Sequence, residues 1–266
     1  MREPQTILIT GASSGIGEAL ALDYAAEGKT LILTGRDLDR LDEVATKCRA
    51  AGAEVRAATI DVTDRDFLAD WLATVDEATP IDLVIANAGI SGGTSGGKES
   101  DEQARRIFAT NLDGVLNTVH PLIERMAARR RGQIALMSSL AAFRGFPSTP
   151  AYCASKAAVR IYGESLRGAL KPRGVQVSVI CPGFVRSRMT SVNPFRMPLL
   201  MDAAKAARII RRGLARDRAR IAFPFPIYFG VWMVGALPPS LTDRLLARMP
   251  RKPSLEQEER ARETAL

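Results

Sequence analysis

Histidine and cysteine are scarce in this chain of 266 residues, which contains one histidine and three cysteines. Cys48, Cys153 and Cys181 are too few and too far apart in the sequence for a disulfide framework or a zinc site. Unpaired cysteines are typical of a reducing compartment, so we predict a cytoplasmic location. No metal-ligand spacing surrounds His120, and we expect it to be a helix or interface residue in a protein that binds no metal.

Export signals, internal repeats and linkers are also lacking. The first residues, MREPQTILIT, enter an apolar strand with no basic region or cleavage site before it. With 46% hydrophobic and 25% charged residues, the composition is that of an ordinary globular protein. We therefore predict one domain over residues 1–250 and a charged peripheral tail over residues 251–266, interrupted by Pro253.

Acidic residues are few in the C-terminal half of the chain. Residues 1–128 contain 12 Lys/Arg and 21 Asp/Glu, whereas residues 129–266 contain 25 and 8. The excess cations gather at residues 129–131 and between residues 205 and 220. Such runs are typical of a solvated helix face, and an anionic partner is the alternative. We do not expect nucleic-acid binding, because no recognition motif or stacking platform accompanies the charge.

Short apolar runs alternate with longer amphipathic segments along the chain, a pattern typical of a parallel sheet with helices on both faces. The runs predict strands at residues 6–10, 30–35, 54–59, 81–86, 133–138, 176–181 and 220–223. Helices are expected to begin near Gly15, Leu38, Asp64, Asp101, Tyr152 and Asp202. The SGGTSGG stretch at residues 91–97 predicts a mobile surface loop. The predicted fold class is α/β.

Three glycines follow the first predicted strand, in the sequence TGASSGIG. Glycines let the chain turn tightly and approach a diphosphate, and free N–H groups at the start of the next helix favour its negative charge. We therefore predict that a dinucleotide binds at Gly11, Ser13, Ser14, Gly15, Ile16 and Gly17. A glycine-rich turn that binds no ligand is the alternative, since the G-x-x-x-G-x-G spacing differs from the common fingerprint.

Arg36 follows the second predicted strand, where a dinucleotide fold meets the adenosine ribose. An acidic residue there would repel a 2′-phosphate, whereas a guanidinium pairs with it. NADP(H) is therefore the preferred cofactor, with NAD(H) as the alternative. Asp37 stands next to this arginine, and an Arg36 that is only a solvated loop residue remains the other interpretation.

Tyr152 and Lys156 stand four residues apart in a segment with a helical pattern. That spacing places both side chains on one face, about 6 Å apart along the helix axis. A neighbouring ammonium lowers the pKa of a phenol toward the range of an acid/base catalyst. Ser139, at the end of the fifth predicted strand, can donate a hydrogen bond to a substrate oxygen that gains charge.

With these features the chain resembles the short-chain dehydrogenase/reductase superfamily, in its single-domain branch, over residues 6–187. The resemblance rests on the TGASSGIG loop, Asp61-Val62, Asn87-Ala88-Gly89, Asn111, Ser139, the YCASK box and Pro182-Gly183. It implies a Rossmann-type doubly wound sheet of about seven strands in the order 3-2-1-4-5-6-7. It also implies a homodimer or homotetramer that pairs through the helices beginning near Asp101 and Tyr152. Ala86, Ala142 and Ser187 depart mildly from the family pattern.

The resemblance also assigns roles to individual residues. Asn111, Ser139, Tyr152 and Lys156 are implied as a catalytic relay, in which Asn111 holds a water and Lys156 also binds the nicotinamide ribose. Asp61 and Val62 are implied to contact the adenine, and Asn87 and Gly89 to shape the cofactor bed. The remaining cofactor residues implied are Tyr152, Pro182, Gly183, Val185, whose backbone meets the carboxamide, and Ser187.

The region from residue 186 to 240 is expected to frame the substrate. Residues 186–200 are rich in Met, Phe, Pro and Leu, which favours an apolar or acyl-chain substrate. Residues 221–237 carry no formal charge but are too short to span a membrane. We expect this segment to complete the sheet and cover the pocket or a subunit contact. A peripheral membrane contact through residues 221–248, with Tyr228, Phe229 and Trp232 in lipid and Arg216, Arg218, Arg220, Arg244 and Arg248 at its head groups, is the alternative.

The predicted function is therefore hydride transfer between NADP(H) and a carbonyl or secondary alcohol, with Tyr152 as the acid/base. One alternative is a nicotinamide-binding regulator with weak catalysis. Another is a membrane-peripheral reductase of lipid- or steroid-type ketones. A sugar-nucleotide epimerase is disfavoured, because it would need a larger C-terminal substrate domain than this length allows.

Overall fold

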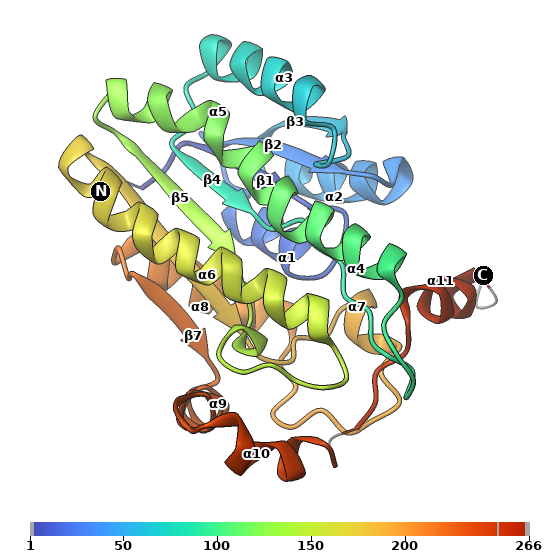
Figure 1. Cartoon of the computed structure of the whole chain (residues 1–266). Helices are drawn as coiled ribbons and strands as arrows, with labels where there is room; N and C mark the ends of the chain where they lie inside the picture. The colour runs from blue at the N-terminus through green and yellow to red at the C-terminus, as the bar shows by residue number, and fades with distance from the viewer. Residues whose placement is uncertain (1–2, 249, 264–266) are drawn as a thin grey trace.

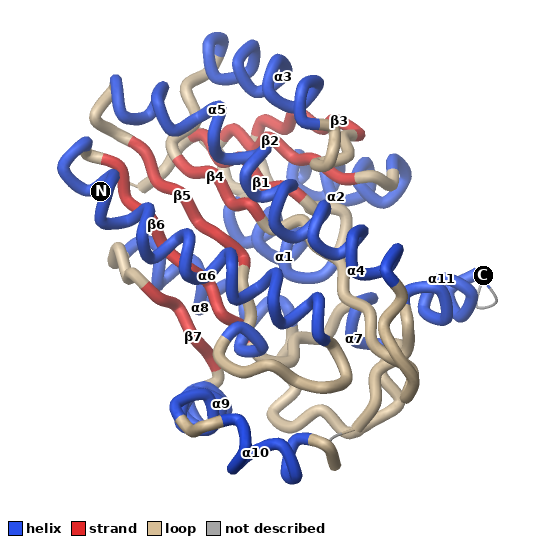
Figure 2. The backbone as a smooth tube through the Cα atoms, in the orientation of Figure 1, coloured by secondary structure: helices blue, strands red, loops and turns tan. Residues whose placement is uncertain are grey.

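In a computed structural model, which describes residues 3–248 and 250–263, seven parallel strands form one sheet. The strand order β3-β2-β1-β4-β5-β6-β7 confirms the predicted Rossmann-type fold (Figures 1 and 2). The strands are β1 (Thr6–Thr10), β2 (Thr30–Gly35), β3 (Glu54–Thr59), β4 (Leu83–Ala86), β5 (Gly132–Met137), β6 (Val175–Pro182) and β7 (Arg220–Phe223).

Alternate side chains of the central strands pack into two separate cores. Ile7 and Ile9 of β1 lie in one core and Leu8 in the other, because successive side chains of a strand point to opposite faces. One face is covered by α1 (Gly15–Tyr24), α2 (Leu38–Ala50) and α8 (Ala203–Ala215). The other is covered by α3 (Arg65–Ala78), α5 (Gly114–Ala128) and α6 (Pro150–Leu170) (Figure 1). Burial on both faces explains the nearly continuous apolar runs in the sequence.

Most of the remaining helices lie around the carboxyl ends of the strands. A π-helical turn, Ala109–Asp113, joins α4 (Asp101–Phe108) to α5, and a short 3-10 turn, Leu140–Ala142, follows β5. A second 3-10 turn, Lys171–Arg173, follows α6 and leads into the amino end of β6. The last helices are α7 (Arg188–Ser191), α9 (Phe225–Ala236), α10 (Pro239–Leu246) and α11 (Leu255–Glu263).

Element boundaries differ from the prediction by one or two residues where a local contact decides them. Strand β4 begins at Leu83 rather than residue 81, because the Ile81 N–H donates to the Asp76 carboxylate at 2.9 Å. Helix α6 begins at Pro150, whose fixed backbone and missing N–H suit the first turn of a helix. Asp64 and Asp202 are the N-cap residues of α3 and α8 rather than their first helical residues.

The prediction of a mobile surface loop at residues 91–97 is wrong in its first half, because Ser91 to Thr94 are buried. The segment that covers them comes from the predicted peripheral tail. The Gly93 N–H donates to the Pro253 carbonyl at 2.6 Å, and the Leu255 N–H donates to Gln103 Oε1 of α4 at 2.7 Å. A Cβ on Gly93 would collide with the Lys252 carbonyl, so glycine allows this close backbone approach.

The tail itself is packed rather than peripheral over residues 252–258, which corrects that prediction. Lys252, Leu255 and Glu258 are buried, and the Lys252 ammonium lies 3.0 Å from the Glu258 carboxylate. It also donates to Asn193 Oδ1 at 3.2 Å, in the segment expected to frame the substrate. The charged composition of this segment therefore reflects an internal ion pair as well as solvation.

Candidate active site

The glycine-rich loop occupies the carboxyl end of β1, where the chain turns into α1. Gly11 and Gly15 have φ angles of +65° and +61°, in the left-handed region that favours glycine. A Cβ on Gly11 would lie 2.8 Å from the Ala88 Cα, and one on Gly17 would collide with the Gly11 carbonyl oxygen. These three glycines therefore bring α1 close to the ends of β1 and β4.

The start of α1 is suited to an anion. Ser14 has extended backbone at the N-cap, and its side chain caps no N–H group of the helix. The first-turn N–H groups of an α-helix lack partners within the helix, and its dipole favours negative charge there. The bare turn, which glycine keeps free of side chains, fits the diphosphate of a dinucleotide.

Asn87 fixes the shape of this loop from the end of β4. Its amide group donates to the carbonyl oxygens of Thr10 at 3.0 Å and Gly11 at 3.1 Å. In return, the Thr10 hydroxyl accepts from the N–H groups of Asn87 at 3.1 Å and Ala88 at 3.2 Å. Asn87 thus holds the ends of β1 and β4 together beside the glycine-rich loop.

We expect Gly17→Ala to weaken NADPH binding by at least about 10-fold, because the added Cβ meets backbone that cannot move without opening the loop. Fluorescence titration with NADPH measures the effect. Gly168→Ala is the matched control, since Gly168 also lies in a helix and a Cβ there meets no atom within 4 Å. Equal affinities for the two variants would contradict the assignment of the loop.

Residues at the ends of β2 and β3 surround the position expected for the adenosine. The Arg36 side chain is 59% exposed, and its guanidinium lies 3.9 Å from the Asp61 carboxylate. Asp37 is engaged elsewhere, because its carboxylate caps α2 and lies 2.6 Å from the Arg40 guanidinium. Val62 is buried, and its carbonyl accepts from Asn117 at 3.0 Å. Arg36 is therefore an exposed cation at this edge of the predicted cofactor site.

Tyr152 and Lys156 lie together on α6, as their spacing predicts. The Lys156 ammonium is 5.9 Å from the centre of the Tyr152 ring and donates to the Met137 carbonyl at 2.9 Å. Burial lowers the pKa of Lys156 to about 8. Burial raises the pKa of Tyr152 to about 12, opposite to the lowering expected from the neighbouring ammonium, while a hydrogen bond with Ser139 acts to lower it. Ser139 follows β5 and joins the pair from the neighbouring strand.

Asn111 lies in the π-helical turn between α4 and α5, a distortion often found at functional sites. Its side chain is fully buried: Oδ1 accepts from the Ile90 N–H at 2.8 Å, and Nδ2 donates to the Ile90 carbonyl at 2.9 Å. Gly89 lies between this side chain and Lys156, since an added Cβ would be 3.1 Å from Asn111 Oδ1 and 3.2 Å from Lys156 Nζ. The structure thus brings Asn111 into the neighbourhood of Lys156.

The segment after β6 returns to the glycine loop. The Gly183 N–H donates to the Phe223 carbonyl at 2.8 Å, so Pro182-Gly183 is fixed to the end of β7. Ser187 is the N-cap of α7, and a Cβ on Gly15 would lie 3.0 Å from the Ser187 Cβ. Val185 pairs with Met201 across an isolated bridge. Each of these predicted residues therefore faces the same end of the sheet as Gly15.

Three polar residues that support the site were missed at the sequence level. The Ser138 hydroxyl donates to the Lys156 carbonyl at 2.7 Å, and the Ser155 hydroxyl accepts from Asn111 Nδ2 at 3.1 Å. Thr190 accepts from the Ser187 N–H at 3.0 Å and donates to the Val185 carbonyl at 2.8 Å. Ser138 and Ser155 adjoin predicted site residues, which is the only signal for them in the sequence.

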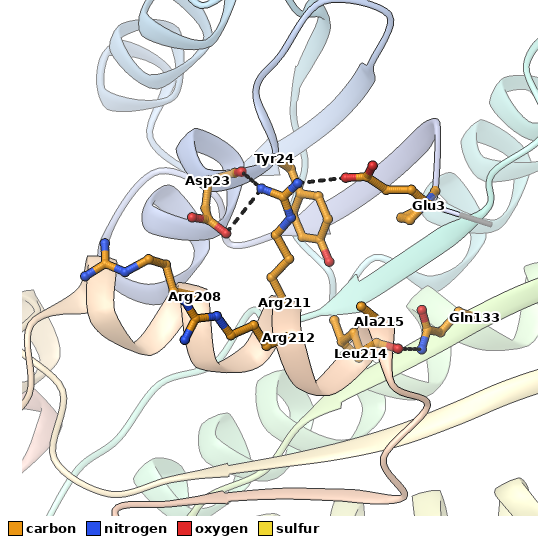
Figure 3. A pocket seen from close by; sticks show the side chains of 10 residues that line it. Glu3, Asp23, Tyr24, Gln133, Arg208, Arg211, Arg212, Leu214 and Ala215 are labelled. Atoms are coloured by element: carbon orange, nitrogen blue, oxygen red, sulfur yellow. Dashed lines mark hydrogen bonds and ion pairs between the residues drawn. The ribbon is translucent and has the colours of Figure 1, made fainter. Parts of the chain in front are cut away.

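Of two cavities that flank α8 in the part of the chain that the structure describes, one adjoins this site. A cavity of about 750 Å³ lies between the glycine loop and the segment before α7, and its lining includes Ser13, Ser14, Gly15, Arg40, Arg186 and Ser187. The other, of about 530 Å³, opens at the amino ends of β1 and β5. Figure 3 shows Arg211 there, between Asp23 and Glu3. The Arg211 guanidinium lies 5.2 Å from the centre of the Tyr24 ring. In the described residues, 3–248 and 250–263, no group of three or more His, Cys, Asp or Glu side chains could hold a metal ion.

A family model described as short chain dehydrogenase matches residues 5–195 of this chain. The chain belongs to the short-chain dehydrogenase family. This short-chain dehydrogenase is 39% identical, over 246 residues, to a Myxococcus xanthus protein named as an uncharacterized oxidoreductase, covering 92% of this chain and 97% of that one. It is 32% identical over 193 residues to a 3-oxoacyl-(acyl-carrier-protein) reductase of Thermotoga maritima, covering 72% and 78%.

Solved structures of short-chain dehydrogenases share the fold. One from Sphingobium yanoikuyae, in complex with NADPH, has a TM-score of 0.77 and 26% identity and covers 92% of this chain and 96% of its own. One from Burkholderia phymatum, in complex with NAD, has a TM-score of 0.78 and 26% identity and covers 94% and 98%. This short-chain dehydrogenase is therefore an NAD(P)-dependent oxidoreductase.

Proposed function

We propose that this enzyme transfers a hydride between NADP(H) and a carbonyl or secondary alcohol, with Tyr152 as the acid/base. The observation that carries the proposal is that the Lys156 ammonium lies 5.9 Å from the centre of the Tyr152 ring, while Ser139 forms a hydrogen bond with the same phenol. A nicotinamide cofactor, when bound, supplies or accepts the hydride. A regulator without catalysis would not need this arrangement.

The environment of Tyr152 suits proton donation to a carbonyl oxygen. A pKa raised to about 12 by burial keeps the phenol protonated at neutral pH, so in the reducing direction the proton is present where it is needed. Ser139 orients the substrate oxygen and donates to it as negative charge develops. The Lys156 ammonium lowers the cost of the phenolate that remains, since opposite charges favour each other in a site of low dielectric.

The positions of the other predicted residues support the roles that we propose for them. The contacts of Asn111 with Ile90 and Ser155 hold the turn at which we place the relay water. Gly11, Ser13, Ser14, Gly15, Ile16 and Gly17 would hold the diphosphate, with Asn87 and Gly89 shaping the bed beside them. Asp61 and Val62 would contact the adenine. Pro182, Gly183, Val185 and Ser187 would meet the nicotinamide end, and Lys156 its ribose.

Arg36 is proposed to set the preference for NADP(H). It projects from the end of β2 with no carboxylate closer than Asp61 at 3.9 Å, and Asp37 is bound to Arg40. A guanidinium in this position pairs with a 2′-phosphate through charge-assisted hydrogen bonds. The complex of the Sphingobium yanoikuyae relative with NADPH is compatible with this preference.

We expect Arg36→Ala to weaken NADPH binding by roughly 10- to 100-fold, the range for losing hydrogen bonds to a charged group, and to leave NADH binding nearly unchanged. Titration of both cofactors measures the two constants. Arg49→Ala, which removes an exposed arginine at the far end of α2, should change neither constant. Equal weakening of NADPH and NADH would refute the assignment.

An apolar or acyl-chain-bearing substrate is proposed for the region after β6. Phe184 and Phe195 pack edge to face, with ring centres 6.2 Å apart, and Asn193 Nδ2 lies 3.4 Å from the Met197 sulfur. Similarity to a 3-oxoacyl-(acyl-carrier-protein) reductase supports an acyl chain. A panel of short aldehydes, 3-oxoacyl compounds and steroid-like ketones, assayed with both cofactors, tests the class. Preference for the short aldehydes would argue against it.

We also propose that the enzyme forms a homodimer or homotetramer through α4, α5 and α6. Support comes from the exposed face of the α5–α6 pair, where the Tyr162 hydroxyl and His120 Nε2 are 2.9 Å apart and Ile161 is 52% exposed. A cytoplasmic location is proposed on the basis of the three unpaired, buried cysteines.

A further inference from the structure

Helices α9 and α10 extend the chain beyond β7, at the edge of the molecule next to the carboxyl end of that strand (Figures 1 and 2). One side of α9 packs inward: Ile227, Tyr228 and Val231 contact a small core that contains Leu140 and Cys181. A Cβ on Gly235 would collide with the Phe143 carbonyl, so the backbone of α9 lies directly against the chain after Ser139. The helix is therefore anchored to the body of the enzyme beside the predicted active site.

The opposite side of α9 carries large apolar side chains into solvent. The exposed fraction is 69% for Phe225, 51% for Phe229 and 47% for Trp232. Neighbouring rings in this row have centres 6.1 Å and 6.3 Å apart, so they form a continuous aromatic surface. We name the exposed row, with its continuation onto α10, the apolar ridge; its members are Phe225, Phe229, Trp232, Met233, Leu237 and Leu241.

The apolar ridge is unusual on this protein. In the described part of the chain, eleven large apolar side chains are exposed, and six of them lie between residues 225 and 241. Single exposed apolar residues are normal, whereas a large contiguous group marks a surface that binds another protein, a membrane or a ligand. Helices that lie in the plane of a membrane interface present Trp, Phe and Leu side chains to the lipid, and the exposed side of α9 carries Phe225, Phe229 and Trp232.

Cations border the ridge. Arg244 and Arg248 are exposed on and after α10. Asp243 is the only acidic residue between residues 221 and 251, and its carboxylate lies 3.4 Å from the Arg144 guanidinium. The rim is therefore positive, which complements the negative surface of a membrane that contains anionic lipid. A two-fold contact with a second copy would instead bring identical positive rims together, because the same patch faces itself.

We propose that the apolar ridge docks this enzyme on an anionic lipid bilayer, with the aromatic rings among the head groups and Arg244 and Arg248 bound to lipid phosphates. No helix in residues 3–248 and 250–263 is long and apolar enough to cross a membrane. The docking surface adjoins the predicted nicotinamide end of the cofactor site, because Pro224, which precedes Phe225, lies 3.1 Å from the position of a Cβ on Gly183. The proposal does not depend on the direction or cofactor of the reaction.

The structure corrects the set of membrane residues expected from the sequence. Tyr228 points inward, where its hydroxyl accepts from Arg220 at 3.1 Å and its ring packs on Phe143. Arg220 also pairs with Glu164, so neither side chain is available to lipid. Arg216 and Arg218 precede β7, whereas the ridge follows it, so they lie at the other end of that strand.

Trp232 provides a direct test, since it is one of only two tryptophans and Trp71→Phe leaves it as the sole reporter. With vesicles of phosphatidylcholine containing roughly a third phosphatidylglycerol, the Trp232 emission should shift to the blue and the protein should sediment with the lipid. Binding should weaken as salt increases, because the Debye length shortens. Phosphatidylcholine vesicles alone should bind at least about 10-fold less protein, for the same electrostatic reason.

Matched variants distinguish lipid binding through the apolar ridge from non-specific adsorption to the vesicles. Phe229→Ser combined with Trp232→Ser should reduce sedimentation with the mixed vesicles at least about 10-fold, since each ring loses its apolar transfer energy. Phe67→Ser, which removes an aromatic ring that is 53% exposed on α3, should leave binding unchanged. The ridge variants should keep NADPH affinity, because their side chains already face solvent.

Two results would overturn the proposal. One is the absence of lipid-dependent sedimentation and of a Trp232 shift at low salt. The other is a change in oligomeric state of Phe229→Ser/Trp232→Ser in sedimentation velocity without lipid, which would assign the ridge to a second copy of the chain.

Discussion

Tyr152→Phe is expected to lower turnover by at least about 100-fold and to leave NADPH affinity unchanged. The change removes only the phenolic oxygen, so the proton donor is lost while the ring still packs beside Lys156. Positioned general acids contribute roughly 100- to 10,000-fold to rate, which sets the size of the effect. Steady-state turnover with an active carbonyl substrate, together with a cofactor titration, measures both parts.

Tyr162→Phe is the control for this experiment. Tyr162 lies on the same helix, but its hydroxyl contacts His120 instead of the active site, so turnover should stay near normal.

The pH dependence of the reaction gives a second readout. Because the pKa of Tyr152 is raised to about 12, carbonyl reduction should be flat across neutral pH, whereas alcohol oxidation, which needs the phenolate, should rise with pH. Near-normal turnover of Tyr152→Phe would refute the assignment.

Asp76→Ala is expected to lower the free energy of unfolding by about 3 kcal/mol, the lower end of the range for breaking a buried ion pair. The Asp76 side chain is 1% exposed and accepts from Arg129 at 2.6 Å and 3.0 Å and from the Ile81 N–H at 2.9 Å. Its loss leaves a buried N–H group without its partner. The effect stays at the lower end because the Arg129 side chain is 30% exposed and can reach water.

Urea denaturation of the enzyme and the variant measures this difference. Asp70→Ala is the matched control on the same helix, since Asp70 is exposed and surface substitutions usually change stability by less than about 0.5 kcal/mol. A loss of the same small size for Asp76→Ala would show that the ion pair contributes little.

The part of this enzyme that the sequence predicts best is the part that follows from local periodicity and from parallel topology. The apolar runs around Ile7 and Ile32 have to be central strands, because both faces are apolar. Once the strands are parallel, the residues after them meet at one edge, which is why Gly11, Asn87 and Ser139 lie together. The Tyr152–Lys156 spacing needs only the geometry of a helix.

The features that were predicted wrongly depend on contacts between distant segments. Nothing near Ser91-Gly92-Gly93 indicates that residues 252–258 will cover it, and polar composition alone predicts solvent exposure. The basic run at residues 129–131 is exposed, as expected, but its ion pairs could not be predicted: Arg129 pairs with Asp76 and Arg131 with Asp82 at 2.8 Å, partners about 50 residues earlier in the chain. Local sequence does not indicate which distant residues will form such pairs.

The burial of Lys156 has a thermodynamic consequence for the whole chain. Its pKa falls from an ordinary 10.5 to about 8 in the folded protein, so between these values the unfolded chain binds more protons than the folded one. Stability therefore rises with pH through this window, and below about pH 8 the folded state carries the full cost of a buried charge. The same Lys156 ammonium supports proton transfer from Tyr152. The pH range in which Lys156 costs the folded state least is therefore the range in which its side chain is neutral and no longer supports that transfer.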